Sequence, residues 1–102
     1  MPGMFPISVN LFRCRCLVVG GGLVATRKVS NLLQCGAFID VVAPLFTEEL
    51  ERIAREGLIT LIPRNFDDKD IQGHMMVFAA TDDEAVNQSI YQICQTEGIL
   101  VN

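Results

Sequence analysis

Three consecutive glycines, followed three residues later by an alanine, are the residues whose types and spacing most clearly indicate chemistry. Residues 20–25 read Gly-Gly-Gly-Leu-Val-Ala and directly follow a short apolar run. In the pattern G-x-G-x-x-A, Gly20 permits a tight turn, Gly22 lets a pyrophosphate approach the backbone, and Ala25 lets a helix pack closely on a strand. The N–H groups and the dipole of the helix start then bind phosphate. The sequence therefore predicts a dinucleotide-binding turn, and a glycine turn without a ligand is the simpler alternative.

The residues after the second predicted strand bear on which dinucleotide fits. A typical NAD site has an Asp or Glu about twenty residues after the glycines, at the end of that strand, where it binds the ribose hydroxyls. Here the strand ends before Pro44 and Leu45, and Asp40 lies too early in the strand. We therefore expect the adenosine ribose to meet backbone groups around residues 43–45. No Arg is present there to pair with a 2′-phosphate, so the sequence favours NAD over NADP.

A second polar segment follows the fourth predicted strand. Thr81, Asp82 and Asp83 come directly after that strand, at the same carboxyl-end edge of the sheet as the glycine turn. Thr81 is therefore a predicted neighbour of the cofactor. For Asp82 and Asp83, capping of the following helix is favoured over catalysis. His74, the only histidine, precedes the fourth predicted strand and therefore lies at the edge of the sheet opposite the expected site. We interpret it as a turn residue rather than a catalytic base.

Strands that alternate with helices must position these residues. Apolar runs bounded by glycine, proline and capping residues predict strands over residues 13–19, 38–43, 58–63, 75–80 and 99–101. They predict helices over residues 23–35 and 47–56, the latter capped by Thr47, a helical turn over residues 67–71, and a helix from Asp82 or Asp83 to Thr96. The apolar stripe of the first helix is assigned to Val24, Val29, Leu32 and Leu33. The expected fold class is α/β, a Rossmann-like doubly wound parallel sheet with strand order 3-2-1-4-5.

The composition is that of one small domain over residues 1–102. Half of the residues are hydrophobic and 20% are charged, which excludes disordered and fibrous classes. The net charge of -4, without a dense Lys/Arg cluster, argues against nucleic acid or an anionic membrane surface as partner. No apolar run approaches the ~20 residues that span a bilayer. No charged segment precedes a long apolar stretch, so a signal peptide is not expected.

The four cysteines, at positions 14, 16, 35 and 94, fall in apolar periodic segments. Cys14 and Cys16 are expected on one face of the first strand, where a disulfide between them would be strained. A Cys-x-Cys pair can begin a metal site, but no second Cys/His pair follows at a ligand spacing, so no metal is expected. Reduced, structural thiols are therefore expected, and they favour the cytoplasm.

Motifs along the whole chain resemble the siroheme synthase N-terminal domain, the precorrin-2 dehydrogenase family. The matching pieces occur in order and are residues 4–7 (MFPI), 16–22 (CLVVGGG), 24–25 (VA), 27–28 (RK), 41–44 (VVAP), 79–83 (AATDD) with Asn87, and 98–102 (GILVN). The resemblance implies an oxidoreductase of siroheme biosynthesis, which oxidises the tetrapyrrole precorrin-2 to sirohydrochlorin with NAD. Some members also insert iron as ferrochelatases.

The resemblance also carries over site residues. Those that match the family's cofactor contacts are Gly20, Gly22, Leu23 and Val24 in the phosphate-binding turn, and Pro44 and Leu45 near the adenosine. The family's catalytic aspartate corresponds to a position shortly beyond Asn102, so no catalytic residue is expected within this chain. We expect the NAD-binding portion of a longer, homodimeric protein. A non-catalytic dinucleotide-sensing module is the alternative, although such modules commonly retain the acidic residue after the second strand.

Overall fold

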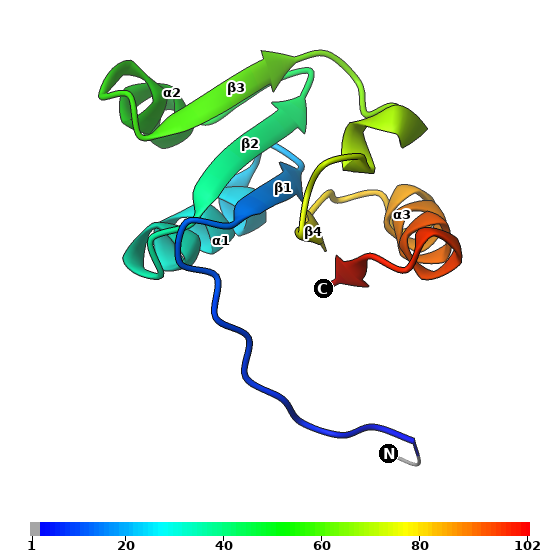
Figure 1. Cartoon of the computed structure of the whole chain (residues 1–102). Coiled ribbons are helices and arrows are strands. Elements are labelled where there is room, and N and C mark those ends of the chain that lie inside the picture. The colour runs from blue at the N-terminus through cyan, green and yellow to red at the C-terminus, as the bar shows by residue number, and fades with distance from the viewer. Residues whose placement is uncertain (1–2) are drawn as a thin grey trace.

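The computed structural model, which describes residues 3–102, contains five parallel strands that alternate with helices (Figure 1). The strands are β1 (Arg15–Val19), β2 (Phe38–Ala43), β3 (Ile59–Pro63), β4 (Met76–Ala79) and β5 (Leu100–Val101). The helices are α1 (Leu23–Gln34), α2 (Glu48–Arg55) and α3 (Glu84–Glu97), with a short 3-10 helix, η1 (Asp68–Ile71), between β3 and β4. Every predicted element is present; the bounds of β2 are those predicted, and the other predicted bounds differ by small shifts at the element ends.

The sheet has the order β3-β2-β1-β4-β5, which confirms the predicted Rossmann-like topology. The central strand β1 pairs in parallel with both of its neighbours, and Val19 at its end is in register with Val42 of β2 and Ala79 of β4. The carboxyl ends of these three strands therefore lie at one edge of the sheet. The strand order reverses between β1 and β4, and open α/β sheets bind their ligands at such a reversal.

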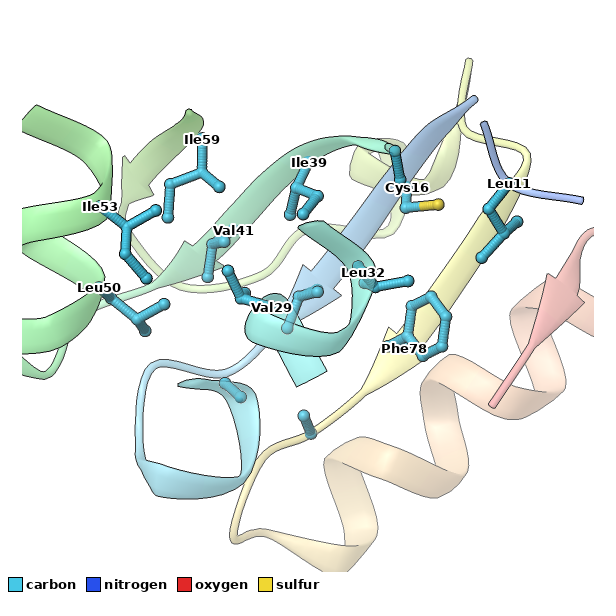
Figure 2. Packing of buried hydrophobic residues seen from close by; sticks show 14 residues of the cluster. Leu11, Cys16, Val29, Leu32, Ile39, Val41, Leu50, Ile53, Ile59 and Phe78 are labelled. Atoms are coloured by element: carbon cyan, nitrogen blue, oxygen red, sulfur yellow. The ribbon is translucent and has the colours of Figure 1, made fainter. Parts of the chain in front are cut away.

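Alternating side chains of β1 divide between two core layers. Cys16 points toward the face that α1 and α2 cover, where it belongs to the same cluster as Val29 and Leu50 (Figure 2). The next residue, Leu17, points to the other face and packs in a cluster with Ile71 of η1 and Ile90 of α3. Both faces of the sheet are thus buried, which explains why the strands read as almost continuous apolar runs.

The apolar stripe of α1 differs from the prediction. Ala25, Val29 and Leu32 are buried, whereas Leu33 is half-buried and Val24 exposes 56% of its surface. The three buried positions have the i, i+4, i+7 spacing of one helix face, so the two neighbouring residues lie at its sides. Val24 is therefore free to face solvent in the first turn of the helix.

The cysteines occupy two different environments. Cys16 and Cys94 are fully buried. Burial, with a smaller contribution from nearby thiols, raises the pKa of Cys16 to about 11, and burial also raises the pKa of Cys94. Cys14 is half-buried, and Cys35 is exposed. The prediction that all four lie in apolar structural segments is wrong for these two, because β1 begins only at Arg15 and α1 already ends at Gln34.

Polar side chains and glycine define the helix ends. Thr47 caps α2, as predicted, and its hydroxyl accepts a hydrogen bond from the Leu50 N–H. Asp83 caps α3 and accepts hydrogen bonds from the backbone N–H groups of the first turn, and Gly98 ends the helix in the left-handed conformation. Across residues 3–102, none of the helices has the length and apolar character needed to cross a membrane.

Candidate functional site

The first two glycines of the turn lie so close to neighbouring backbone that no side chain fits. Gly20 has a φ of +129°, and an added Cβ would lie 2.3 Å from the carbonyl oxygen of Ala80. At Gly21 an added Cβ would lie 1.9 Å from the carbonyl oxygen of Leu45. The Gly21 carbonyl in turn accepts a hydrogen bond of 2.9 Å from the Thr47 N–H. The turn is therefore held between the segments that follow β2 and β4. Gly21 occupies an x position of the G-x-G-x-x-A pattern, yet the space around it excludes a side chain as strictly as the space around Gly20.

Gly22 has a different environment, because the space around it is open. Its φ of -92° is accessible to any residue, and an added Cβ would meet no atom within 4 Å. Gly22 is the N-cap of α1, where no side chain caps the first-turn N–H groups and no acidic residue lies in the first turn. The start of α1 thus presents N–H donors and the positive end of its dipole to open space. This arrangement suits a phosphate group.

All seven predicted cofactor-binding residues line one cavity of about 960 Å³ at the carboxyl edge of the sheet. They are Gly20, Gly22, Leu23, Val24, Pro44, Leu45 and Thr81. The side chains of Leu23 and Leu45 are exposed by 76% and 81%, so they contribute apolar surface beside the polar backbone of the turn. A cavity with apolar walls and a few convergent polar groups is typical of small-molecule and cofactor sites.

Two further segments, which the sequence motifs did not indicate, also line this cavity. Asn65 and Phe66 follow β3, and Val86 and Ser89 come from the first turns of α3. The predicted strand order contained a signal for the first pair, because β3 ends beside β2 at the same edge of the sheet. Phe66 and Val86 are half-buried against the core layer on the α3 side of the sheet.

Thr81 lies in the cavity wall, and a neighbouring amide engages its polar groups. The Thr81 hydroxyl donates to Oδ1 of Asn87 at 2.6 Å, and the same oxygen accepts from the Thr81 N–H at 3.2 Å. Nδ2 of Asn87 donates back to the Thr81 carbonyl at 3.1 Å. Asn87, which belongs to the family motif, therefore fixes the segment after β4.

The two aspartates after β4 have different roles. Asp83 has extended backbone angles and a side chain that accepts from the N–H groups of Ala85 and Val86, as an N-cap does. Asp82 is exposed and lines the cavity. Of the two capping alternatives, only Asp83 is correct, because the helix begins one residue after it. The Asp82 carboxylate forms no hydrogen bond within residues 3–102.

Asp40 and His74 form a polar cluster away from the cavity. His74 precedes β4 in a turn, as predicted, and its side chain is only 6% exposed. Its Nε2 atom lies 2.8 Å from Oδ2 of Asp40, and the same oxygen accepts a hydrogen bond of 2.9 Å from Arg15. Nδ1 of His74 is buried without a partner among the described residues. The cluster joins β2 to the starts of β1 and β4, and neither Asp40 nor His74 lines the candidate site.

Residues 3–102 contain no group of three or more His, Cys, Asp or Glu placed to hold a metal ion.

Asp40 is expected to make the stability of the fold sensitive to acid. Burial raises the pKa of Asp40, but the hydrogen bonds and charges of His74 and Arg15 outweigh this effect and hold the pKa below its ordinary value. Such a carboxylate stabilises the fold above the pKa of the unfolded chain, about 3.9, and this contribution is lost as the pH falls through the lower folded pKa. We therefore expect the urea concentration at the midpoint of unfolding to decrease as the pH is lowered below about 4.

The variant Asp40→Asn isolates this contribution. It should lower the urea midpoint at neutral pH and reduce the fall in acid relative to the unsubstituted chain. Asp70, whose pKa the hydrogen bond from Arg64 lowers, keeps its own contribution in both proteins. An acid transition of equal steepness in the two proteins would contradict a role for Asp40.

Known proteins share both the sequence pattern and the fold of this chain. The family model described as "Putative NAD(P)-binding" matches residues 7–102. The siroheme synthase of Nitrosococcus oceani is 43% identical over 97 residues, which cover 95% of this chain and 21% of that protein. The siroheme synthase of Pseudoalteromonas atlantica is 44% identical over 98 residues, which cover 96% of this chain and 21% of that protein. The chain thus spans about a fifth of the length of these curated relatives.

A solved structure matches the fold closely. The structure of "SirC, precorrin-2 dehydrogenase" aligns with a TM-score of 0.82 and 30% sequence identity. The alignment covers 97% of this chain and 48% of that chain. The five-stranded sheet described above therefore corresponds to about half of the matched structure.

Proposed function

Because this chain belongs to the NAD(P)-binding family whose model matches residues 7–102, we propose that it is the NAD-binding part of a precorrin-2 dehydrogenase. The observation that carries the proposal is the uncapped start of α1 at Gly22, which opens into the cavity that all seven predicted contacts line. The siroheme synthase relatives and the SirC structure support precorrin-2 as the substrate. Sirohydrochlorin is the product that the family resemblance implies.

Three segments of the chain contact different parts of the dinucleotide. The N–H groups at Gly22 and in the first turn of α1 bind the pyrophosphate. The backbone at Pro44 and Leu45 binds the adenosine side, and the segment that begins with Thr81 borders the other end of the cavity. Bound NAD supplies the hydride acceptor, and the protein supplies binding, orientation and electrostatics. No residue within 3–102 is assigned a catalytic role.

NAD is expected to bind more tightly than NADP. Residues 43–46, Ala-Pro-Leu-Phe, offer no cation to the extra phosphate of NADP at the end of β2. We expect a preference of about tenfold, which corresponds to ~1.4 kcal/mol, in calorimetric titrations of the 102-residue chain. Leu45→Arg is the matched variant, because Leu45 is exposed at the cavity rim, and it should improve NADP binding. Equal or tighter binding of NADP by the unsubstituted chain would show that Arg27, Lys28 or another residue reaches the 2′ position. No affinity for either cofactor would contradict the proposed function.

The 102-residue chain is expected to bind NAD without oxidising precorrin-2. Correct positioning of two reactants is worth ~7–11 kcal/mol of the barrier, and the cavity residues that have a proposed role are assigned to the cofactor alone. An anaerobic assay that follows NADH formation with precorrin-2 and NAD is the measurement. A longer protein that contains this chain should form NADH in the same assay, and its failure to do so would contradict the proposed reaction. Turnover by the 102-residue chain, lost in Asp82→Asn, would instead place the reaction at Asp82.

A further inference from the structure

Two threonine hydroxyls connect the glycine turn to the segment after β2. Thr26 lies in the first turn of α1, and Thr47 is the N-cap of α2. Their Oγ1 atoms are 2.8 Å apart and partly buried. Thr47 also lines the candidate cavity, whereas Thr26 lies behind the turn and does not. Neither residue belongs to the G-x-G-x-x-A pattern.

The surrounding contacts fix the direction of the hydrogen bond between the two hydroxyls. The Thr26 hydroxyl donates to the carbonyl of Gly22 at 2.8 Å, which uses its only proton. The Thr47 hydroxyl oxygen accepts from the Leu50 N–H at 3.2 Å, so its own proton is free to be donated to Thr26. A continuous relay therefore runs from the start of α2 through both hydroxyls to the Gly22 carbonyl, and every donor in it has an acceptor.

A second link runs beside this relay. The Thr47 N–H donates to the Gly21 carbonyl at 2.9 Å, and the carbonyl of Leu45 lies against Gly21. Both links join residues 20–22 to residues 43–47, which the proposed function assigns to the pyrophosphate and to the adenosine. A ligand that spans the two segments gains affinity when their spacing is fixed before it binds.

We propose that Thr26 and Thr47 are positioning residues, which hold the phosphate-binding turn and the adenosine-binding segment at the spacing that a dinucleotide requires. This inference rests on the proposed function, because it assigns a role within the same NAD site. The hydroxyls act through the backbone of Gly22 and through the start of α2, and Thr26 does not line the cavity. Their effect should therefore appear for ligands that bridge both segments and not for ligands that occupy only one.

The test compares Thr26→Val, which replaces the hydroxyl with a methyl group of similar size, with Thr26→Ser, which keeps the hydroxyl. Calorimetric titrations of the 102-residue chain use NAD, which spans both segments, and adenosine and inorganic pyrophosphate, which each occupy one. We expect Thr26→Val to weaken NAD binding about tenfold, the effect of one net hydrogen bond of ~1.4 kcal/mol. Its affinities for adenosine and pyrophosphate should equal those of the unsubstituted chain, and Thr26→Ser should bind all three normally.

The three ligands distinguish a positioning role from a purely structural one. If Thr26→Val binds NAD as tightly as the unsubstituted chain, the positioning role is wrong and the proposed function stands. If it weakens all three ligands equally, the relay only supports the fold and the positioning role is also wrong. If the unsubstituted chain fails to bind NAD, the proposed function itself is wrong. Thermal unfolding of each variant shows that it is folded, and Thr26→Ala takes the place of Thr26→Val if the valine variant does not fold.

Discussion

Gly22→Asp is expected to abolish dinucleotide binding while the fold remains intact. An added Cβ at this position meets no atom within 4 Å, and its backbone angles suit an ordinary N-cap residue. Asp is among the preferred N-cap residues, so its carboxylate should accept hydrogen bonds from the first-turn N–H groups of α1. Those donors would then be unavailable to the pyrophosphate, and two negative charges would compete for one helix start.

The expected loss of NAD affinity is about 100-fold or more, which corresponds to ~2.7 kcal/mol. Calorimetric titration measures it, and urea unfolding shows that the variant is folded. Gly22→Asn is the matched control, because it places a side chain of similar size at the same N-cap without the charge. It should retain more affinity than Gly22→Asp. Normal NAD binding by a folded Gly22→Asp protein would remove Gly22 from the site.

Gly21→Ala is expected to produce the opposite pattern, a loss of stability. The added methyl group would lie 1.9 Å from the Leu45 carbonyl oxygen and 3.0 Å from the Cβ of Ala43. The first of these atoms belongs to the backbone, so relief requires movement of the segment after β2 together with its hydrogen bond to the turn. Overpacking of this kind costs about 1–3 kcal/mol or more, which should lower the urea midpoint clearly.

Gly22→Ala is the control for this second prediction. It adds the same methyl group one residue later, where the space is open, and should lower the urea midpoint less, because only the poorer N-cap preference of alanine opposes it. If Gly21→Ala were equally stable, the segment after β2 would be free to move away from the turn. The clamped geometry described for the site would then be incorrect.

The fold was predictable because its signals are local in the sequence. Gly20 follows the end of a strand, Thr47 precedes the start of a helix and Gly98 follows the end of one. Each marks its boundary through a backbone or capping preference that is local in the sequence. The strand over Phe38–Ala43 was predicted with its observed bounds. Where two neighbouring residues satisfied the same preference, as Asp82 and Asp83 did for the start of α3, the sequence left the choice open and the structure settled it.

The candidate site was predictable only in part, for a different reason. The glycine pattern and the rule for the carboxyl edge of parallel sheets brought seven residues to one cavity. The hydroxyl pair of Thr26 and Thr47 and the amide of Asn87 carry no such signal, because their roles come from side-chain contacts with other segments of the chain. The exposure of Val24 was also missed, since Val24 is apolar but lies beside the buried row of Ala25, Val29 and Leu32.

The close approach of Gly20 to the Ala80 carbonyl has a consequence for the order in which the chain folds. Strands β1, β2 and β3 and the two helices between them are consecutive, so the chain up to Pro63 can assemble this part of the sheet during synthesis. The turn acquires its second wall only when β4 docks beside β1, a pairing between strands that lie far apart in the chain and that therefore forms late. NAD would therefore recognise the assembled sheet and not its first half, and a saturating cofactor pool would favour the last docking step by mass action.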